Sequence, residues 1–543
     1  MVAKEARSPD REGPQQPQHS GTTAGLDGTV DQRFPPEPAG TTLLRAGAAA
    51  GSGLAQLLAL PPYGLWYLAP LSATLLLLAV RGVRPRRAAW LGALAGAALM
   101  VPLIRWQAVF GFDVWLLIAA AETAYFIPMA VGIALAARLP GWIVWTSALW
   151  VAQELVRARW PLGGFPWGKL AFSQPDTPFT GYAAVGSSAL VTFAVAATGA
   201  LIAAALLRLW RQRRPDLPTV ILMVVVAGIV AGGTLTPRLG SVEADRTVTA
   251  GIVQGNVPGV GEMDITGERR EVLNNHVAAT HELADAVAAG AHEQPDMVIL
   301  PENASDIDPY RDADAQDAIQ GAADAVDAPL LIGVTEVVGE QQREVQSVVW
   351  EPEEGPGETY VKRYLVPFGE YIPYRDFFTT FVSRLDQVGM DAIPGTDPGA
   401  LDLGETRVAT AICFDVAFDA PVRQAVAEGG EVLVVPTNNA NYNFTGQSEQ
   451  QLAITQLRAV EHGRAALVSS TSGISAVVEP DGSLSYVSAE AQRDIHVANV
   501  PAMQGHTPAT SLGAIPEWAI TLVGVGALAV GYVLQRRAKR GPA

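Results

Sequence analysis

Eight long apolar stretches constrain the fold of this 543-residue chain more than any other feature. A helix needs about 20 apolar residues, or about 17 at the short end, to cross the hydrocarbon core of a bilayer. Seven stretches lie in the first half of the chain and one lies near its end, at residues 43–60, 64–80, 88–104, 114–137, 141–156, 182–207, 219–236 and 516–535. The sequence therefore predicts a membrane domain of seven helices at 41–236 and an eighth helix at 516–535.

The basic residues between these stretches predict the side of the membrane on which each loop lies. Short cytoplasmic loops are enriched in Lys and Arg. With the N-terminus inside, the inner loops and the basic tail 536–543 carry Arg81, Arg84, Arg86, Arg87, Arg138, Arg208, Arg211, Arg213, Arg214, Arg536, Arg537, Lys539 and Arg540, and the short outer loops only Arg105, Arg157, Arg159 and Lys169. We therefore expect both termini in the cytoplasm and residues 237–515 outside it. Residues 1–40 lack an apolar run, which indicates a disordered tail.

The segment between the seventh and eighth stretches has a different composition. Residues 241–500 hold 42 of the 54 acidic residues and 14 of the 37 basic ones, a formal charge of −28, so the rest of the chain sums to +11. A nucleic acid partner requires clustered Lys and Arg to neutralise phosphates, and this block has no such cluster. The charge pattern therefore excludes nucleic-acid binding as the function of the acidic block.

The apolar pattern in the acidic block changes to short runs that alternate with helical segments. We expect strands near Thr247–Val257, Met297–Glu302, Leu330–Val337, Val345–Glu351, Thr359–Val366, Val408–Phe414, Val432–Thr437, Ala466–Ser470 and Ile474–Glu479. Helices are expected near residues 268–289, 313–325, 418–428 and 447–462. This alternation predicts one α/β domain with layered sheets and outer helices.

Three predicted strands carry reactive side chains. Glu302 follows an apolar strand, Lys362 lies inside a predicted strand, and Cys413 lies near the end of another. A thiol attacks as the thiolate, and a neighbouring carboxylate and lysine can supply the base and the cation that this requires. The lysine, with a backbone N–H such as that of Phe414, could also stabilise an oxyanion. Taken singly, Cys413 could be a small core residue, Lys362 an edge-strand charge and Glu302 a turn acid.

Other residues limit the chemistry or suggest a shaped membrane loop. Cys413 is the only cysteine, which excludes an internal disulfide and a Cys-based metal site, and we expect no metal or cofactor. Residues 161–174 are dense in Gly, Pro and aromatics, which is typical of a re-entrant or interfacial loop with Trp167 at headgroup level, or of an ordinary interfacial turn. Glu122 and Glu154 lie at or near lipid depth, so each is expected to face protein or water and to pair with an arginine such as Arg157.

Several motifs carry a resemblance to a known family. The segments Pro301–Ala304, Tyr360–Pro373 and Cys413–Asp415 resemble the Glu–Lys–Cys signature of the nitrilase superfamily. The long central motif, together with flanking membrane spans, resembles the apolipoprotein N-acyltransferase family, and the resemblance also covers Val253–Pro258, Gly164–Gly168, Arg458–Arg464 and Thr471–Ala476. It implies a multi-span membrane domain joined to an extracytoplasmic nitrilase-like α-β-β-α sandwich in a bacterial cell membrane.

The resemblance also implies a reaction and its partners. Cys413 would take an acyl chain from a membrane phospholipid as a thioester and pass it to the α-amino group of S-diacylglyceryl-cysteine in a lipoprotein. Glu302 would act as general base and then acid, Lys362 would support the anionic intermediate, and Glu370 would assist them. Because some relatives are fused to a polyprenol-phosphate mannosyltransferase, a separate enzyme of that kind is a further expected partner.

Two alternatives and three departures from the family pattern accompany this interpretation. A membrane-tethered nitrilase-like amidase could use the same triad on a soluble amide, and a non-catalytic scaffold could bind a glycosyltransferase. The family's Cys-Tyr-Glu is Cys413-Phe414-Asp415 here, its Asn-Asp-Ala-Trp-Phe-Gly loop becomes Asn438–Phe444, and Met263 replaces a common tryptophan. The triad is intact, and the departures concern loops expected to contact lipid.

Overall fold

The computed structural model describes residues 39–236, 244–259, 270–381 and 389–540. The residues from Ala39 onward form one compact unit. The predicted tail at 1–40 lies outside the described residues except for Ala39 and Gly40, which begin the first helix, and Met263 also lies outside them. The following account concerns this described unit.

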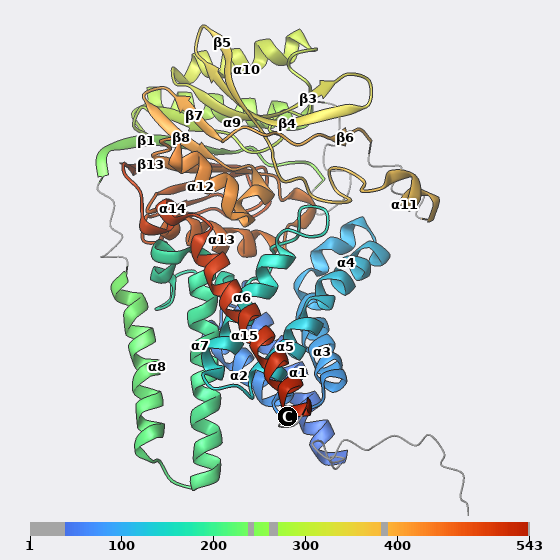
Figure 1. Cartoon of the computed structure of the whole chain (residues 1–543). Helices are drawn as coiled ribbons and strands as arrows, with labels where there is room; N and C mark the ends of the chain where they lie inside the picture. The colour runs from blue at the N-terminus through green and yellow to red at the C-terminus, as the bar shows by residue number, and fades with distance from the viewer. Residues whose placement is uncertain (1–38, 237–243, 260–269, 382–388, 541–543) are drawn as a thin grey trace, which may run out of the picture. The chain divides into compact units, whose positions relative to one another are not determined.

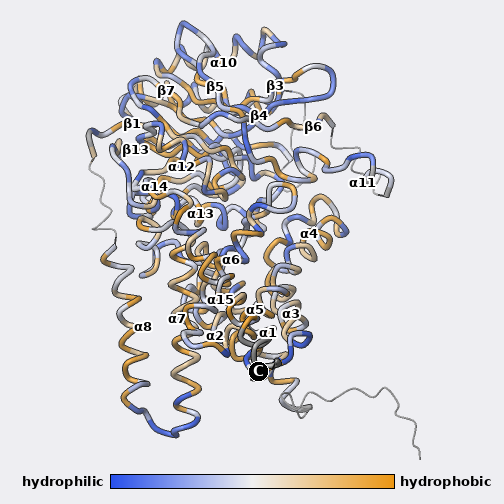
Figure 2. The backbone as a smooth tube through the Cα atoms, viewed as in Figure 1, coloured by the Kyte–Doolittle hydropathy of each residue, from blue (hydrophilic) through white to orange (hydrophobic). Residues whose placement is uncertain are grey.

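Each of the eight apolar stretches is helical, and Figure 2 shows hydrophobic residues along these helices. They are α1 (Ala39–Ala59), α2 (Leu68–Val80), α3 (Pro85–Leu103), α4 (Phe112–Ala124), α5 (Phe126–Ala136), α6 (Trp142–Arg157), α7 (Ala183–Gln212), α8 (Leu217–Leu235) and α15 (Ile515–Arg540). By length and composition, four described segments are long and apolar enough to cross a membrane: Phe112–Ala136, Thr180–Gln212, Leu217–Leu235 and Ile515–Val533. The number of passes and their orientation remain predictions.

Two boundaries in the membrane half differ from the prediction. The fourth stretch, predicted as one helix, is two helices that meet at Tyr125. Pro128 lies in the first turn of α5, where its missing N–H costs no helical hydrogen bond, so the second helix can begin just before it. The last helix also continues to Arg540, so the residues predicted as a basic tail are helical as far as the description extends.

The acidic block contains two sheets. The first has the strand order β13-β1-β2-β3-β4-β5 with β6 paired to β4, and the second has the order β12-β11-β10-β9-β8-β7. The strands of the first are β1 (Ala244–Gln254), β2 (Met297–Ile299), β3 (Leu330–Val338), β4 (Gln342–Glu351), β5 (Gly355–Val361), β6 (Asp391–Ala392) and β13 (Asp494–Met503). Those of the second are β7 (Ala400–Leu403), β8 (Thr406–Thr410), β9 (Val432–Thr437), β10 (Ala466–Ser470), β11 (Ala476–Val478) and β12 (Leu484–Val487).

Helices cover the outer faces of the two sheets (Figure 1). Helices α9 (Glu271–Ala288) and α10 (Ala313–Val326) share an apolar core with the first sheet, and a second core of apolar strand residues fills the space between the sheets. Helices α12 (Asp419–Ala427) and α13 (Gln447–His462) pack on the second sheet, and α13 also packs against α7 of the membrane half. The predicted α-β-β-α sandwich is therefore confirmed, and its α13 layer adjoins the membrane helices.

The sequence reproduced most of these elements but missed several. All nine expected strands and all four expected helices of the block are present, and β9, β10 and α13 have the predicted bounds. The prediction omitted β6, β7, β12 and β13 and the short helices α11 (Arg375–Phe381) and α14 (Pro508–Leu512). Lys362 is not inside a strand, because β5 ends one residue earlier. Likewise Cys413 follows β8 after two residues and begins a 3-10 turn, Cys413–Ala417.

Candidate active site

The fold brings Glu302, Lys362 and Cys413 to one cavity of about 280 Å³. Glu302 follows β2, Lys362 follows β5, and Cys413 follows β8. Both β2 and β8 pair in parallel with a neighbouring strand. Glu302 and Cys413 therefore follow the carboxyl ends of parallel strands, where α/β folds place their sites. Glu370, the fourth predicted site residue, lines the same cavity.

A lysine between two carboxylates forms the polar centre of the cavity. The Nζ atom of Lys362 lies 2.8 Å from Oε1 of Glu302 and 2.7 Å from Oε1 of Glu370. Burial alone would lower the pKa of Lys362, but the two carboxylates hold that pKa well above its ordinary value. The ammonium therefore stays charged and places a permanent positive charge beside Glu302.

Both carboxylates are fixed by backbone donors as well as by the lysine. Oε2 of Glu302 accepts a hydrogen bond of 2.9 Å from the N–H of Asn438, and Oε2 of Glu370 accepts one of 2.7 Å from the N–H of Val366. Burial raises the pKa of Glu302 above its ordinary value, against the opposing effect of Lys362. A carboxylate with a raised pKa that is held in one orientation is suited to accept and return a proton.

The cysteine is buried and held in a strained backbone conformation. Cys413 has a φ of 50°, a region that non-glycine residues rarely occupy, and its side chain is 6% exposed. Its Sγ lies 4.0 Å from Oδ1 of Asn439 and 3.9 Å from Oε1 of Gln451, and it is also within hydrogen-bonding range of Glu302. Burial and the charge of Glu302 raise the pKa of the Cys413 thiol to about 12. The resting nucleophile is therefore a thiol that needs a base, rather than a preformed thiolate.

Asp415 ties the turn that carries Cys413 to the segment that carries Lys362. Its Oδ1 accepts a 2.7 Å hydrogen bond from the N–H of Tyr364, and its Oδ2 accepts a 2.8 Å bond from the hydroxyl of Tyr360. Burial raises the pKa of Asp415 to about 6. The shorter Asp at this position, where the family often has Glu, thus connects the two catalytic segments directly.

A glycine of β3 permits the close approach that places Glu302. A Cβ on Gly333 would lie 2.3 Å from the carbonyl oxygen of Pro301 and 2.5 Å from Cα of Glu302. The N–H of Gly333 also donates to the Pro301 carbonyl at 3.1 Å. Any side chain at position 333 would therefore displace the backbone that carries the carboxylate.

Trp167, for which the sequence predicts a position at the headgroup level, is buried within the protein. It is 1% exposed, its ring lies 6.1 Å from that of Phe414 between centroids, and its indole N–H donates to Oε1 of Gln450 at 2.6 Å. Phe165 of the same loop lies 5.7 Å from the Phe414 ring, also between centroids. The Gly- and Pro-rich loop therefore packs against the residue next to the nucleophile, and its depth relative to the membrane stays a prediction.

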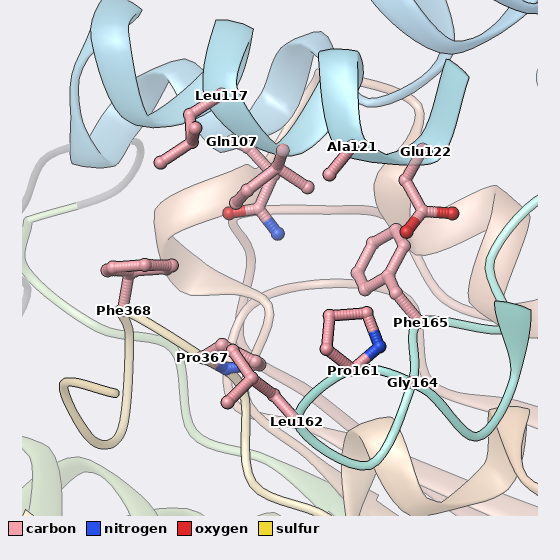
Figure 3. A pocket seen from close by; sticks show the side chains of 11 residues that line it. Gln107, Leu117, Ala121, Glu122, Pro161, Leu162, Gly164, Phe165, Pro367 and Phe368 are labelled. Carbon is pink, nitrogen blue, oxygen red and sulfur yellow. The ribbon is translucent and has the colours of Figure 1, made fainter. Parts of the chain in front are cut away.

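A second cavity, of about 210 Å³ and mostly apolar, is shown in Figure 3, and it shares the segment 366–369 with the first. Leu117 and Ala121 of α4 line it on one side, and Leu162 and Phe165 of the loop after α6 line it on another. Pro367 and Phe368 also line it, as do the polar side chains of Gln107 and Glu122. The chain neighbours of Pro367 and Phe368, Val366 and Gly369, line the catalytic cavity. The segment 366–369 thus lies between a polar cavity and an apolar one that reaches membrane helix α4.

Glu122 and Glu154, which the sequence predicts at or near lipid depth, are both buried within the protein. Glu122 pairs with Arg157 as expected, at 3.2 Å. Glu154 instead accepts hydrogen bonds from the N–H of Leu170 at 2.7 Å and from the hydroxyl of Thr192 at 2.8 Å. Glu154 therefore fixes the start of the 3-10 turn that follows the Gly- and Pro-rich loop.

Sequence reasoning missed two groups of residues around the site. Asn438, Asn441 and Tyr442 line the catalytic cavity directly after β9. The signal was available, because they follow a buried apolar strand just as Glu302 does. A buried ion network behind Cys413 had no comparable local signal, since its partners Lys169, Asp419 and Arg458 are far apart in the chain.

Comparisons with known proteins show the family to which the chain belongs. The model of the apolipoprotein N-acyltransferase N-terminal domain matches residues 52–201, and that of the carbon-nitrogen hydrolase domain matches residues 249–507. An apolipoprotein N-acyltransferase from Mycolicibacterium smegmatis is 37% identical over an alignment of 507 residues that covers 90% of this chain and 85% of that protein. The chain belongs to the apolipoprotein N-acyltransferase family. Another apolipoprotein N-acyltransferase, from Azotobacter vinelandii, is 30% identical over 91% of this chain and 96% of its own length.

Solved structures of the nitrilase superfamily cover about half of this family member. An amidase of the nitrilase superfamily from Nesterenkonia matches 50% of this chain and 96% of its own, with 18% identity and a TM-score of 0.37. A score this low carries no argument about substrate. Family membership therefore rests on the sequence relatives, and the roles of individual site residues rest on the geometry above.

Proposed function

We propose that this chain transfers an acyl chain from a membrane phospholipid to the N-terminal α-amino group of S-diacylglyceryl-cysteine in lipoproteins, through a thioester on Cys413. The observation that carries the proposal is the pair of adjoining cavities, one with the thiol, carboxylate and ammonium and the other apolar and lined by α4. The names of the relatives support the same substrates. They do not support a mannosyltransferase partner, and neither the amidase nor the scaffold alternative gains an observation of its own.

In the first half-reaction Glu302 takes the proton of the Cys413 thiol as sulfur attacks the ester carbonyl of the phospholipid. The C=O electron pair moves to the oxygen, and Lys362 stabilises this oxyanion, aided by the backbone N–H of Phe414. The intermediate then collapses as the C–O bond to glycerol breaks. Glu302 returns its proton to the departing glycerol oxygen, which leaves a lysophospholipid and an acyl thioester.

In the second half-reaction the α-amino group of the lipoprotein attacks the thioester carbonyl. Glu302 accepts a proton from the attacking nitrogen, and Lys362 again stabilises the oxyanion. The C–S bond breaks, the thiolate takes the proton back, and an amide is formed. Water must be excluded while the thioester exists, and the buried position of Cys413 meets this requirement.

The acyl chain would occupy the apolar cavity. With its carbonyl in the catalytic cavity, the acyl chain would pass the segment 366–369 and meet the side chains of Leu117 and Phe165 and, from the segment itself, Phe368. Burial of hydrocarbon there contributes about 0.8 kcal/mol per CH₂ group. This arrangement favours a lipid donor, because a soluble amide would leave the apolar surface exposed to water.

The experiment that tests the function is mass spectrometry of lipoprotein N-termini from cells that lack this protein, complemented with wild type or with Cys413→Ala. We expect wild type to restore the N-acyl group and Cys413→Ala, present in the membrane at the same level, to leave a free α-amino group. Restoration by Cys413→Ala would refute the thioester route. Failure of wild type to change the N-termini would refute the substrate.

A further inference from the structure

A separate cavity of about 250 Å³ lies at the end of the membrane helices remote from the active site. Helix α7 begins beside α13 of the sandwich, and the cavity is formed at its other end, where Arg208 and Arg211 lie in the last turns. The lining comes from four helical regions, α2, α6, α7 and α8, and combines apolar and cationic side chains: Arg81, Trp142, Ile143, Ala204, Leu207, Arg208, Arg211 and Leu222. No acidic residue is among them.

The arginines of this cavity outnumber the carboxylates that pair with them. Arg208 pairs with Asp216 at 2.6 Å. Within the part of the chain that the structure describes, no carboxylate pairs with Arg81 or Arg211, and Nη1 of Arg81 is buried without a hydrogen-bond partner. Arg81 and Arg211 line the same cavity, and burial together with the like charge of Arg211 lowers the pKa of Arg81. The guanidinium of Arg81 lies 4.6 Å from the centroid of the Trp142 ring, so one of its faces is covered.

The end of α2 supplies no further compensation. The backbone carbonyls of Leu78, Ala79 and Arg81 accept hydrogen bonds from Nη1 of Arg45, at 3.3, 2.7 and 3.0 Å. These carbonyls form the negative end of the helix dipole, and a second cation already occupies them. The cavity therefore presents two uncompensated guanidinium groups.

We propose that this cavity binds the phosphate of an anionic phospholipid in the leaflet that surrounds this end of the helices. Guanidinium groups bind phosphate oxygens through paired N–H donors, and basic pockets between membrane helices are known to bind anionic headgroups. The apolar part of the lining, Ile143, Leu207 and Leu222, fits the hydrocarbon next to a lipid phosphate and does not suit free inorganic phosphate. Two excess positive charges favour a lipid with a net negative charge over a zwitterionic one.

The position of α8 makes this cavity accessible to lipid. Most apolar side chains of α8, including Val220, Ile221 and Val224, are exposed at the surface of the protein, as expected of a helix surrounded by lipid. Helix α8 packs mainly against α7. A lipid in the cavity would therefore connect α8 to α2 and α6, and its binding should raise the thermal stability of the membrane half. This site is independent of the proposed acyl transfer.

The test uses the full-length protein purified in neutral detergent and titrated with phosphatidylglycerol or phosphatidylcholine, with bound lipid counted by native mass spectrometry. The variant Arg81→Gln/Arg211→Gln removes the two uncompensated charges. The matched control is Arg213→Gln/Arg214→Gln, which removes the same charge from the α7–α8 turn outside the cavity lining. We expect about a tenfold or greater loss of phosphatidylglycerol affinity in the cavity variant and less than about a twofold loss in the control.

Thermal unfolding and competition by inorganic phosphate provide two further readouts. Thermal unfolding in phosphatidylcholine alone should be the same for the cavity variant and wild type, and only wild type should gain stability from phosphatidylglycerol. Inorganic phosphate should fail to displace the lipid at equal concentration. Equal losses in both double variants would show general surface attraction and overturn the proposal. Equal binding of phosphatidylcholine, or displacement by inorganic phosphate, would also overturn it.

Discussion

At the scale of single residues, the chemistry depends on a thiol that burial keeps protonated. The pKa of Cys413 is raised to about 12, and burial raises the pKa of Glu302 above the ordinary value of 4.5. Glu302 works as a base only when ionised, so thioester formation should increase as pH rises through its raised pKa and then level off. No second increase should occur near pH 8.5, where an ordinary thiol ionises. Quenched time courses of acyl-enzyme formation at a series of pH values test this profile.

Replacement of the base should change both the rate and the shape of that profile. Glu302→Gln keeps size and hydrogen bonding but cannot take a proton, so thioester formation should slow by at least about 10²–10⁴-fold. The residual rate should then rise about tenfold per pH unit up to high pH, because only preformed thiolate reacts. A variant with the wild-type plateau would assign the base to another residue.

Glu370 is predicted to position Lys362 and to hold the segment that separates the two cavities. It contacts the ammonium at 2.7 Å and accepts the N–H of Val366 at 2.7 Å. Glu370→Gln should therefore slow both half-reactions by about tenfold or more, since each needs the oxyanion held by Lys362. Acyl-enzyme formation and transfer are measured separately. Wild-type rates in both steps would show that Glu370 does not position Lys362.

The site residues differ in how readily the sequence reveals them. Glu302, Cys413 and the Asn438–Tyr442 loop follow apolar strands, and strand ends are where such folds place reactive groups. The aromatic and β-branched residues of Thr359–Val366 predict a strand that includes Lys362, whereas the chain leaves the sheet after Val361. The contact of Trp167 with Phe414 has no local signal in the sequence, because only tertiary packing brings the two rings together.

At the scale of elements, a buried ion network joins the membrane half to the turn that carries Cys413. Lys169 of the membrane half lies 3.4 Å from Asp419 of α12, which pairs with Arg458 of α13 at 2.5 Å. Arg458 donates to the carbonyls of Val416 and Ala417, at 2.9 and 3.1 Å, in the same 3-10 turn as Cys413. The network thus holds the strained turn through the hydrogen bonds of Arg458 to its carbonyl groups.

Asp419→Asn should leave the buried Lys169 without its ion-pair partner, whereas Arg458 keeps its pair with Glu461. Breaking a buried pair in this way costs about 3–5 kcal/mol, so the thermal midpoint should fall and thioester formation should slow at temperatures where the variant is folded. The conservative Arg458→Lys keeps the charge but loses the paired donors to Val416 and Ala417, so it should slow acylation with a smaller loss of stability. Unchanged acylation in both folded variants would contradict a positioning role.

The predictability of elements follows from their burial. Strands β9 and β10 and helix α13 are buried almost throughout and have the predicted bounds. Strand β13 was missed although it has ten residues, because it lies at a sheet edge, is half-buried and contains His496, Asn499 and Pro501. Edge strands often carry such polar residues and Pro, which obscure the alternation.

At the scale of the whole molecule, the distribution of basic residues predicts that the sandwich lies outside the cytoplasm. Cys413 is buried, so an exposed reporter is needed. Glu354→Cys in a Cys413→Ala background places a single thiol on an exposed turn of the segment 351–358. A membrane-impermeant thiol reagent should label it in intact cells. Labelling that appears only after permeabilisation would invert the predicted topology.

The central claim is that Cys413 carries the acyl chain, and the most direct measurement is the intact mass of the purified protein after incubation with a phospholipid alone. Because the first half-reaction needs no acceptor, the mass should increase by one acyl group, located on the only thiol in the chain. Hydroxylamine or a diacylated lipopeptide should then remove it, and Cys413→Ala should show no increase. An adduct that persists in Cys413→Ala, or transfer to lipopeptide without any adduct in wild type, would contradict the account.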